Sequence, residues 1–536
     1  MIRDSLGARQ RMSQERSSAS NEMLADRARQ AYDQAPYRSV ALMRLHPARL
    51  AGRAMLLGLE PPPVATARIL EIGCASGGHI IPLAAAFPTA RFLGLDISPR
   101  QIADGRARIE RLGLRNIELA ARSLADLSES DGVFDFIIAH GLYSWIPGAL
   151  RDDLLRVCGE RLSPNGLALI SYNVLPGWRL FEIARDSMAL HAGGEADQKK
   201  RSDKTRRLFA LLKERADPET SYGRFWLNEA QKMAAGDDAY FTHEIFEEAS
   251  APCPFRDFSA RAARWGLSYV GEARARANCV ESVAPGASAI IEDLSGGDPG
   301  SREQYVDIFS GRTFRESILA RAAHARRIDR SDEMNRLADL HLVAPIGLDV
   351  KAVDGQADAI AIADGDAALR CNDPNVIESI RRLIARRPSS SRLADIAPSA
   401  AKNGRAALLA FLWRMAETGL LDVSSEPVVC AEGLPARPKA SALAASDAKA
   451  GDLTATLRHA PFPMDMLDRF LLPKLDGGRS RDSLVDLVVD EAANGRLQAK
   501  GPEGAIHDRK VLRAALSAEV DRRLGTYARI GLLVAS

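Results

Sequence analysis

A short run of small residues and one later carboxylate form the clearest chemical pattern in the chain. The run Gly73–Gly78 follows the apolar segment Arg68–Ile72, and Asp96 directly follows a second apolar segment, Arg91–Leu95. A buried strand, a glycine turn, a helix and a second strand ending in an acid begin a doubly wound α/β sheet, with its ligand at the carboxyl ends of the strands. We therefore expect Asp96 to accept hydrogen bonds from the ribose hydroxyls of a nucleotide-type ligand.

The turn itself favours S-adenosyl-L-methionine (AdoMet) over a dinucleotide. Ala75 stands where the fingerprint G-x-G-x-x-G requires its second glycine, which lets the backbone approach a pyrophosphate. AdoMet has no phosphate, so a looser turn of small residues is enough beneath its methionine part. His79, at the start of the next helix, is placed to reach the carboxylate of that part. The glycines alone would equally serve tight helix–strand packing.

Two loops rich in aromatic residues are expected above the ends of the fourth and fifth strands, residues 139–147 and 171–178. A sulfonium is an activated leaving group, so methyl transfer there needs alignment in a dry pocket and no metal. Aromatic faces attract a cationic ammonium or sulfonium, and a hydroxyl or amide can orient an amine. We predict His140 beside the cofactor, Tyr143 and Asn173 as catalytic residues, and Trp145, Tyr172 and Trp178 as substrate-binding residues.

Each of these residues also has a structural alternative. Trp145 and Trp178 would serve equally well to pack the loops onto the sheet, and Tyr172, within a strand, suits the core. His140 and His79 would equally satisfy backbone groups or face solvent.

The elements that must position these loops alternate between strand and helix. Amphipathic helices are expected at Ser98–Leu112 and Leu150–Arg161, where Ser98 caps its helix and Pro99 tolerates the first turn. Strands joined by helical crossovers form a parallel sheet, so the predicted fold class is α/β, a doubly wound (Rossmann-like) core. The expected strands are Arg68–Ile72, Arg91–Leu95, Ile117–Ala120, Phe134–Ala139 and Leu167–Tyr172.

Beyond Trp178 the pattern becomes helical and charged. Residues 372–427 give a helix, a Pro-Ser-rich loop, a second helix and a strand, which is typical of a winged-helix-like module, and residues 453–536 show a similar order. We predict a mainly helical region and two small winged-helix-like C-terminal modules after the core. The expected boundaries are 1–35 (lead-in), 36–180 (ligand-binding core), 181–350 (helical middle region), 355–430 (first module), 431–450 (linker) and 451–536 (C-terminal helical module).

Composition excludes several classes of function. The 536 residues are 46% hydrophobic and 26% charged, with a net charge of +2, so several globular domains are expected and nucleic-acid binding is disfavoured. The six cysteines are scattered, which predicts reduced thiols and no metal site. No apolar run is long enough to span a bilayer and no secretory signal is visible, so we expect a cytoplasmic protein.

Several runs carry a family resemblance. Tyr143–Pro147 and Tyr172–Trp178 are specific, and similar runs occur at Ala31–Tyr37, His46–Leu50, Ile69–Cys74, Leu457–His459 and Leu475–Arg481. They resemble the bacterial class I methyltransferases with a methyltransferase regulatory domain, a group that includes the rickettsial outer-membrane-protein lysine methyltransferases. The resemblance covers nearly the whole chain.

The resemblance implies a class I methyltransferase core with AdoMet as cofactor. It implies cofactor contacts at Gly73, Gly77 and Asp96 and an adenine edge near Ser123 and Leu124; Glu71, Ile97, His79 and His140 complete the predicted set. Two residues depart from the family's pattern, since His79 stands in place of Asn and Ser123 in place of Asp. A hydroxyl binds adenine less strongly than an ionised carboxylate.

Three functions follow from these patterns. The leading hypothesis is AdoMet-dependent methylation of protein lysine side chains, because the large C-terminal part suits a macromolecular acceptor. The alternatives are methylation of a small amine, lipid or other metabolite, and a non-enzymatic regulatory or nucleic-acid-binding role of the winged-helix-like modules. The resemblance also implies a homodimer.

Overall fold

A seven-stranded sheet forms the centre of the structure, a computed structural model that describes residues 29, 33 and 36–535 apart from 234–237, 239–240, 248, 354–355, 365–366, 398–401, 498–499, 502–503 and 506–508. Most of the predicted lead-in, residues 1–35, lies outside the described residues. The strand order is β3-β2-β1-β4-β5-β7-β6. The strands are β1 Arg68–Ile72, β2 Arg91–Asp96, β3 Ile117–Ala121, β4 Phe134–Ala139, β5 Leu162–Asn173, β6 Leu267–Glu272 and β7 Phe314–Arg321.

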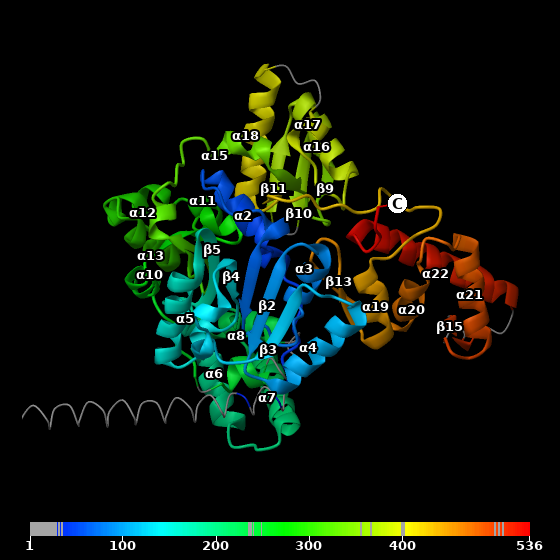
Figure 1. The fold of residues 1–536 in the computed structure, drawn as a ribbon, viewed down its shortest axis with the longest axis horizontal. Helices are drawn as coiled ribbons and strands as arrows, with labels where there is room; N and C mark the ends of the chain where they lie inside the picture. The colour runs from blue at the N-terminus through cyan, green and yellow to red at the C-terminus, as the bar shows by residue number, and fades with distance from the viewer. Residues whose placement is uncertain are drawn as a thin grey trace, which may run out of the picture.

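The first five strands are parallel and their side chains alternate between two cores. Ile69 of β1 packs into one core, whereas Leu70 and Ile72 pack into the other. This alternation is the period of two that a strand imposes, and burial on both faces explains the nearly continuous apolar runs. Figure 1 shows helices covering the sheet. Those nearest the site are α2 Pro47–Leu56, α3 Ile80–Ala86, α4 Pro99–Leu112, α5 Gly148–Arg161 and α10 Phe255–Arg264.

The predicted α/β fold class is confirmed. The helix that follows Asp96, α4, begins at the predicted cap. Ser98 is the N-cap of α4, and its hydroxyl accepts a hydrogen bond from the Gln101 N–H at 3.1 Å. Gly113, in the left-handed conformation at φ +65°, ends that helix.

Two strands of the sheet were not predicted. β7 pairs antiparallel with β5, and β6 pairs antiparallel with β7, so both join the sheet from within the region expected to be helical, residues 181–350. Besides α10, the helices described in that region are α6 Arg179–Ala192, α7 Gln198–Arg215, α8 Ser221–Met233, α11 Val280–Val283, α12 Ser288–Ser295, α13 Pro299–Ser310, α14 Ala322–Ala325 and α15 Glu333–Arg336. The core therefore extends well beyond residue 180.

A buried arginine ties β7 to its surroundings. The Arg315 guanidinium is fully buried, and it forms ion pairs with Glu272 of β6 at 2.6 Å and Asp307 of α13 at 2.8 Å. Glu303 of α13 adds a third carboxylate at 3.1 Å, and the guanidinium lies 4.4 Å from the centre of the Phe255 ring. Arg315 thereby joins the sheet edge to α13 and α10 through charge as well as packing.

Two further bodies follow the sheet in the chain (Figure 1). The middle module contains β8 His341–Val343, β9 Asp349–Val353, β10 Gln356–Asp364, β11 Ala367–Cys371, α16 Pro374–Ala385, α17 Leu393–Ile396, α18 Lys402–Thr418 and β12 Asp422–Ser424. The C-terminal body contains α19 Ala442–Ala450, β13 Leu453–Ala455, β14 Pro461–Pro463, α20 Met466–Leu471, α21 Arg481–Ala493, β15 Lys500–Gly501, β16 Gly504–Ala505 and α22 Arg509–Ile530.

The segment expected as a linker, 431–450, is largely part of the C-terminal body. It contains α19, whose Ala444 and Ala448 are buried in the same core as Leu471 and Leu484. Short alanine-rich sequence resembles a linker in composition, yet its small side chains here allow close packing.

We expect Arg315→Met to destabilise the protein strongly, because it leaves several buried carboxylates without their cation. Breaking a buried ion pair costs about 3–5 kcal/mol, which for a chain of 536 residues corresponds to a fall in Tm of about 3–5 °C. Thermal unfolding by circular dichroism measures the effect. The control is Arg179→Ala, which removes an exposed pair with Glu182 and should change Tm little. Equal Tm values for the two variants would contradict a structural role for the buried network.

Candidate functional site

The glycine turn after β1 is held against the end of β2. The N–H groups of Gly73 and Cys74 donate to the Leu95 carbonyl at 2.8 and 3.0 Å. Gly73 and Gly77 both have φ values near +75°, which glycine adopts without steric cost. Ala75 shares the left-handed region at φ +50°. The turn therefore has a fixed shape at the carboxyl ends of β1 and β2.

The Asp96 carboxylate holds the glycine turn in this shape through hydrogen bonds. One oxygen of its carboxylate accepts from the Ala75 N–H at 2.8 Å and the other from the Ser98 N–H at 2.9 Å. An ionised carboxylate has about four acceptor positions, so capacity remains for two ribose hydroxyls. Glu71, which precedes the turn, is buried; burial and then the nearby Asp96 raise the pKa of its carboxyl well above the usual range.

A segment that precedes α2 in the chain packs against the turn. The Gly78 N–H donates to the Ser39 hydroxyl at 2.8 Å, and a Cβ at Gly78 would lie 2.1 Å from the Ser39 carbonyl oxygen, so only glycine fits there. The Asp33 carboxylate accepts from the Ser98 hydroxyl, and its backbone carbonyl accepts from Arg100 at 2.7 Å. Sequence reasoning missed Ser39 and Asp33, although two of the family-like runs flank Ser39.

His140 lies where β4 ends, next to a carboxylate that the sequence did not reveal. Its Nδ1 is 3.8 Å from Glu316 of β7, and the next N–H, that of Gly141, donates to the Ser171 hydroxyl at 2.7 Å. Glu316 also pairs with Arg44 and, at 2.8 Å, with Arg274. Burial lowers the pKa of His140 to about 4, so its ring is neutral at physiological pH.

Tyr143 and Tyr172 both pack on Phe258 but have different surroundings. The Tyr143 ring meets Phe258 edge to face at 5.2 Å, whereas Tyr172 stacks on Phe258 at 4.0 Å. The Tyr172 hydroxyl is within 3.2 Å of the Ser317 hydroxyl of β7. These contacts are those of a core residue, so the structure gives no support to a substrate-binding role for Tyr172.

The two predicted tryptophans lie together across the two loops. The Trp145 and Trp178 rings meet edge to face at 6.2 Å, and the Arg185 guanidinium lies 5.5 Å from the Trp145 ring centre. Asn173 is fixed nearby, since its N–H donates to the Ser144 hydroxyl at 2.9 Å. The structure thus brings Tyr143, Asn173 and the two tryptophans into one region.

At the predicted adenine edge, Ser123 already serves a structural function. Its hydroxyl accepts from the Ala125 N–H at 3.2 Å and caps a short 3-10 helix, Leu124–Asp126. Its O–H is still available as a donor. Leu124 is buried in the core beside β2 and β4, and Ile97 is half-buried beside Asp96.

Six of the predicted site residues share an unusual property. Each has a buried polar side-chain atom that makes no hydrogen bond of normal geometry to the described residues, although Arg261 lies near the Tyr143 hydroxyl. Buried polar groups are almost always paired, so such a concentration indicates a ligand site. The atoms are Glu71 Oε2, His79 Nε2, His140 Nδ1, the Tyr143 hydroxyl, Asn173 Nδ2 and Trp178 Nε1.

A cluster of three histidines adjoins the turn, and its members, far apart in the chain, could not be grouped from their spacing. His79 lies 4.6 Å from His459 of the C-terminal body, and His459 lies 5.2 Å from His46 at the start of α2, both measured between ring centres. Burial lowers the pKa of His46 to about 3 and those of His79 and His459 well below the usual value. Within the described residues, no group of His, Cys, Asp or Glu side chains has an arrangement suited to a metal ion.

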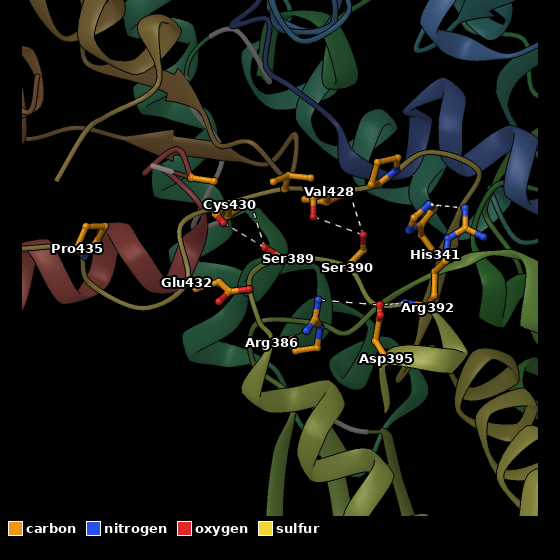
Figure 2. Close-up of a pocket in the computed structure, with 13 residues that line it drawn as sticks. His341, Arg386, Ser389, Ser390, Arg392, Asp395, Val428, Cys430, Glu432 and Pro435 are labelled. Atoms are coloured by element: carbon orange, nitrogen blue, oxygen red, sulfur yellow. Dashed lines mark hydrogen bonds and ion pairs between the residues drawn. The ribbon is translucent and has the colours of Figure 1, made fainter. Parts of the chain in front are cut away.

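A pocket of about 570 Å³ lies elsewhere, between the middle module and the C-terminal body (Figure 2). Its charged groups are of both signs, Arg386 and Arg392 against Asp395 and Glu432. The hydroxyls of the serines at 389 and 390 already bond the backbone of residues 428–430. None of the predicted site residues lines this pocket.

Comparison with known proteins agrees with this geometry. Residues 70–168 match the family "Methyltransferase domain", 237–321 match "Predicted methyltransferase regulatory domain" and 436–532 match "PKMT, C-terminal winged helix domain". The Rickettsia prowazekii protein RP028 is 34% identical over 232 residues, 43% of this chain and 93% of that protein. RP789 of the same organism is 36% identical over 290 residues, 54% of this chain but only 52% of that protein.

The chain belongs to the AdoMet-dependent methyltransferases that carry a methyltransferase regulatory domain. The fold has the same relatives, because PKMT2 from Rickettsia typhi superimposes with a TM-score of 0.80 at 25% identity over 93% of this chain and 100% of that one. PKMT2 has also been solved in complex with AdoHcy (TM-score 0.81, 24% identity, the same coverage). Within the described part of the chain, none of the helices has the length and apolar character needed to cross a lipid bilayer.

The site residues fit AdoMet, the family's cofactor. The unpartnered buried atoms of Glu71 and His79 lie beside the turn, and that of His140 lies beyond β4. Asp96 has free acceptor capacity for the ribose, His79 offers a donor for a carboxylate, and the Ser123 hydroxyl and the apolar side chain of Leu124 suit adenine. These residues would hold the cofactor along the carboxyl ends of β1, β2 and β4.

We expect Asp96→Ala to raise the Kd for AdoMet by about 100-fold or more. The change removes two hydrogen bonds to an ionised acceptor, each contributing about 1.5–3 kcal/mol, and it also releases the Ala75 N–H. Isothermal titration calorimetry measures the affinity. Asp104→Ala, an exposed acid on α4, is the matched control and should bind as the wild type does. Wild-type affinity in Asp96→Ala would contradict the assignment.

The buried histidines should make the fold sensitive to acid. An unfolded histidine has a pKa near 6.5, whereas burial lowers that of folded His46 to about 3. Below pH 6.5 the unfolded chain therefore binds more protons, and stability falls as the pH drops from 6.5 towards 3.

His46→Asn should reduce this loss, by up to about 2 kcal/mol at pH 5. Asparagine can still accept the Ala48 N–H that His46 accepts as the N-cap of α2, but it does not titrate. The measurement is the difference in Tm between pH 7.5 and pH 5. His191→Asn, at an exposed position in α6, should behave as the wild type; an unchanged difference in His46→Asn would refute the idea.

Proposed function

We propose that this chain transfers methyl groups from AdoMet to the side-chain amines of lysine residues in a protein substrate. AdoMet supplies an electrophilic methyl group. The observation that carries the proposal is the group of buried polar atoms at the ends of β4 and β5, those of Tyr143, Asn173 and Trp178, which make no hydrogen bond of normal geometry to the described residues. The acceptor class is taken from the resemblance to the rickettsial lysine methyltransferases and from the likeness to PKMT2.

The loop residues suit a lysine amine. The Trp145 and Trp178 rings offer aromatic faces to a cationic or alkyl amine. Burial raises the pKa of Tyr143 to about 12, so its hydroxyl remains protonated and can hydrogen-bond the nitrogen. The Asn173 amide is held beside it by backbone bonds and offers a second polar group. Together these residues would aim the nitrogen lone pair at the methyl group, which is most of what this reaction requires.

Two arginines favour the neutral amine that the reaction needs. The Arg151 guanidinium lies 6.0 Å from the centre of the Tyr143 ring, and Arg261 lies near the Tyr143 hydroxyl. A lysine in water has a pKa near 10.4, and like charges nearby disfavour its protonated form. Arg151 and Arg261 would therefore lower the pKa of an incoming lysine and promote release of its proton to solvent.

We expect Tyr143→Phe to lower kcat by about 100-fold while AdoMet binding is kept, because one positioned hydrogen bond in the reacting complex has roughly that effect. Phenylalanine preserves the packing against Phe258. Tyr172→Phe is the matched control, because it removes a hydroxyl that faces Ser317 in the core. The assay is radiolabel transfer from AdoMet into a bacterial lysate, followed by amino-acid analysis for methyl-lysine.

The same assay separates the functions. Label that remains with polypeptide and becomes soluble after protease digestion supports a protein acceptor, and methyl-lysine in the hydrolysate supports lysine. Label in small molecules that is indifferent to protease would replace this proposal with a metabolite methyltransferase. Full activity in Tyr143→Phe would reject the hydroxyl's role.

A further inference from the structure

One buried contact joins the C-terminal winged-helix domain to the glycine turn. Nε2 of His459 lies 2.8 Å from Nδ1 of His79, although 380 residues separate them in the chain. Both side chains are buried. Burial, followed by neighbouring histidines, lowers the pKa of each well below its usual value, so both rings are neutral.

The partners of His79 determine where its proton lies. The Leu42 N–H points to His79 Nδ1 at 3.3 Å, which makes Nδ1 an acceptor. His459 Nε2 faces the same atom, so it must be the donor of the 2.8 Å hydrogen bond. The proton of His79 is then on Nε2, a buried atom that has no partner among the described residues.

His459 is held firmly in the position that this contact requires. It is one of two non-glycine residues among those described with positive φ, at +60°, a strained conformation that persists only where the surroundings enforce it. Its neighbour Arg458 donates to the carbonyls of Pro388 and Ala344 in the middle module at 2.6 and 2.7 Å. The Leu457 N–H donates to the Gly531 carbonyl at 2.8 Å.

We propose that His459 is a positioning residue of the cofactor site: together with the Leu42 N–H, it holds the His79 ring with its proton on Nε2, where that N–H serves the carboxylate of the methionine part of AdoMet. The C-terminal domain then completes a site whose other known parts come from the sheet and the N-terminal segment. The inference rests on the cofactor assignment and is independent of the methyl acceptor.

Calorimetric binding of two probes to the full-length protein tests the proposal. AdoMet carries the carboxylate, and decarboxylated AdoMet lacks it, so the ratio of their Kd values reports the carboxylate contact. In His459→Ala we expect the Kd for AdoMet to rise about tenfold, while that for decarboxylated AdoMet changes little. The ratio should therefore collapse towards one.

Two further variants separate positioning from docking. His459→Gln keeps an N–H donor at the place of Nε2 and should restore most of the AdoMet affinity. Glutamine and alanine must adopt the same positive-φ backbone at this position, so the two variants differ in the donor and not in backbone strain. Arg108→Gln weakens another contact of the same domain, the ion pair with Asp447 at 2.7 Å, and should leave both Kd values unchanged. A loss of affinity in Arg108→Gln equal to that in His459→Ala would reject the positioning role.

Nitrogen NMR of the histidine side chains gives a test in the unmodified protein, whatever the variants' stability. We expect His79 to show a protonated Nε2 and a bare Nδ1, with assignment by comparison with His79→Gln. A proton on Nδ1 would overturn the proposal, as would an unchanged Kd ratio in His459→Ala. If the wild type binds AdoMet but labels no protein, the proposed function falls and this inference stands; if it binds no AdoMet, both fall.

Discussion

The cost of burying polar atoms without partners governs how the carboxyl edge of this sheet is built. Each such atom destabilises the fold by about 1–3 kcal/mol, yet six of them gather at the ends of β1, β4 and β5 and in the adjoining loops. Parallel pairing of β1 with β2 and β4 brings those ends to one edge. Asp96 is bonded to both Ala75 and Ser98, which fixes the turn. The unpartnered polar atoms are therefore held apart and do not form hydrogen bonds with one another. A ligand with a ribose, a carboxylate and an amine could supply the hydrogen-bond partners that these polar atoms lack.

The parts of the fold that depend on local pattern were predicted from the sequence. β1 and β4 occupy the predicted ranges because both are apolar runs bounded by polar or glycine residues, and α4 begins at its predicted cap. β7 escaped prediction for a physical reason. β7 contains Arg315, Glu316 and Ser317, all buried, whose charges and hydroxyls are balanced by residues on β6, α13 and the N-terminal segment. A strand stabilised by ion pairs has no hydrophobic alternation to detect.

The site shows the same division. The positions of the glycine turn, Asp96 and the aromatic loops could be predicted because each lies at the end of a strand in the alternation of strands and helices. The residues next to Tyr172 in the sequence did not indicate where its hydroxyl would lie. In the structure it lies beside the hydroxyl of Ser317, 145 residues away. Ser39 bonds the glycine turn, and Glu316, which also pairs with Arg44, lies beside His140; all three come from segments with no chemical pattern of their own. Likewise His79 looked like a helix-start residue, and its place in a buried pair became visible only with the C-terminal domain in position.

The contact between His79 and His459 lies between the glycine turn and the C-terminal domain. On the proposal above, docking of that domain and AdoMet binding would depend on each other. His459 adopts a strained backbone conformation, and burial lowers the pKa of Arg458 to about 10, so both residues carry a cost in the docked arrangement. The hydrogen bonds of Arg458 to the middle module and of His459 to His79 offset it. If docking of this domain orients a donor for the cofactor, then the cofactor must favour docking by the same factor, because coupling free energies between binding events are reciprocal. On that proposal, AdoMet binding and docking of the C-terminal domain would stabilise each other through the contact between His79 and His459.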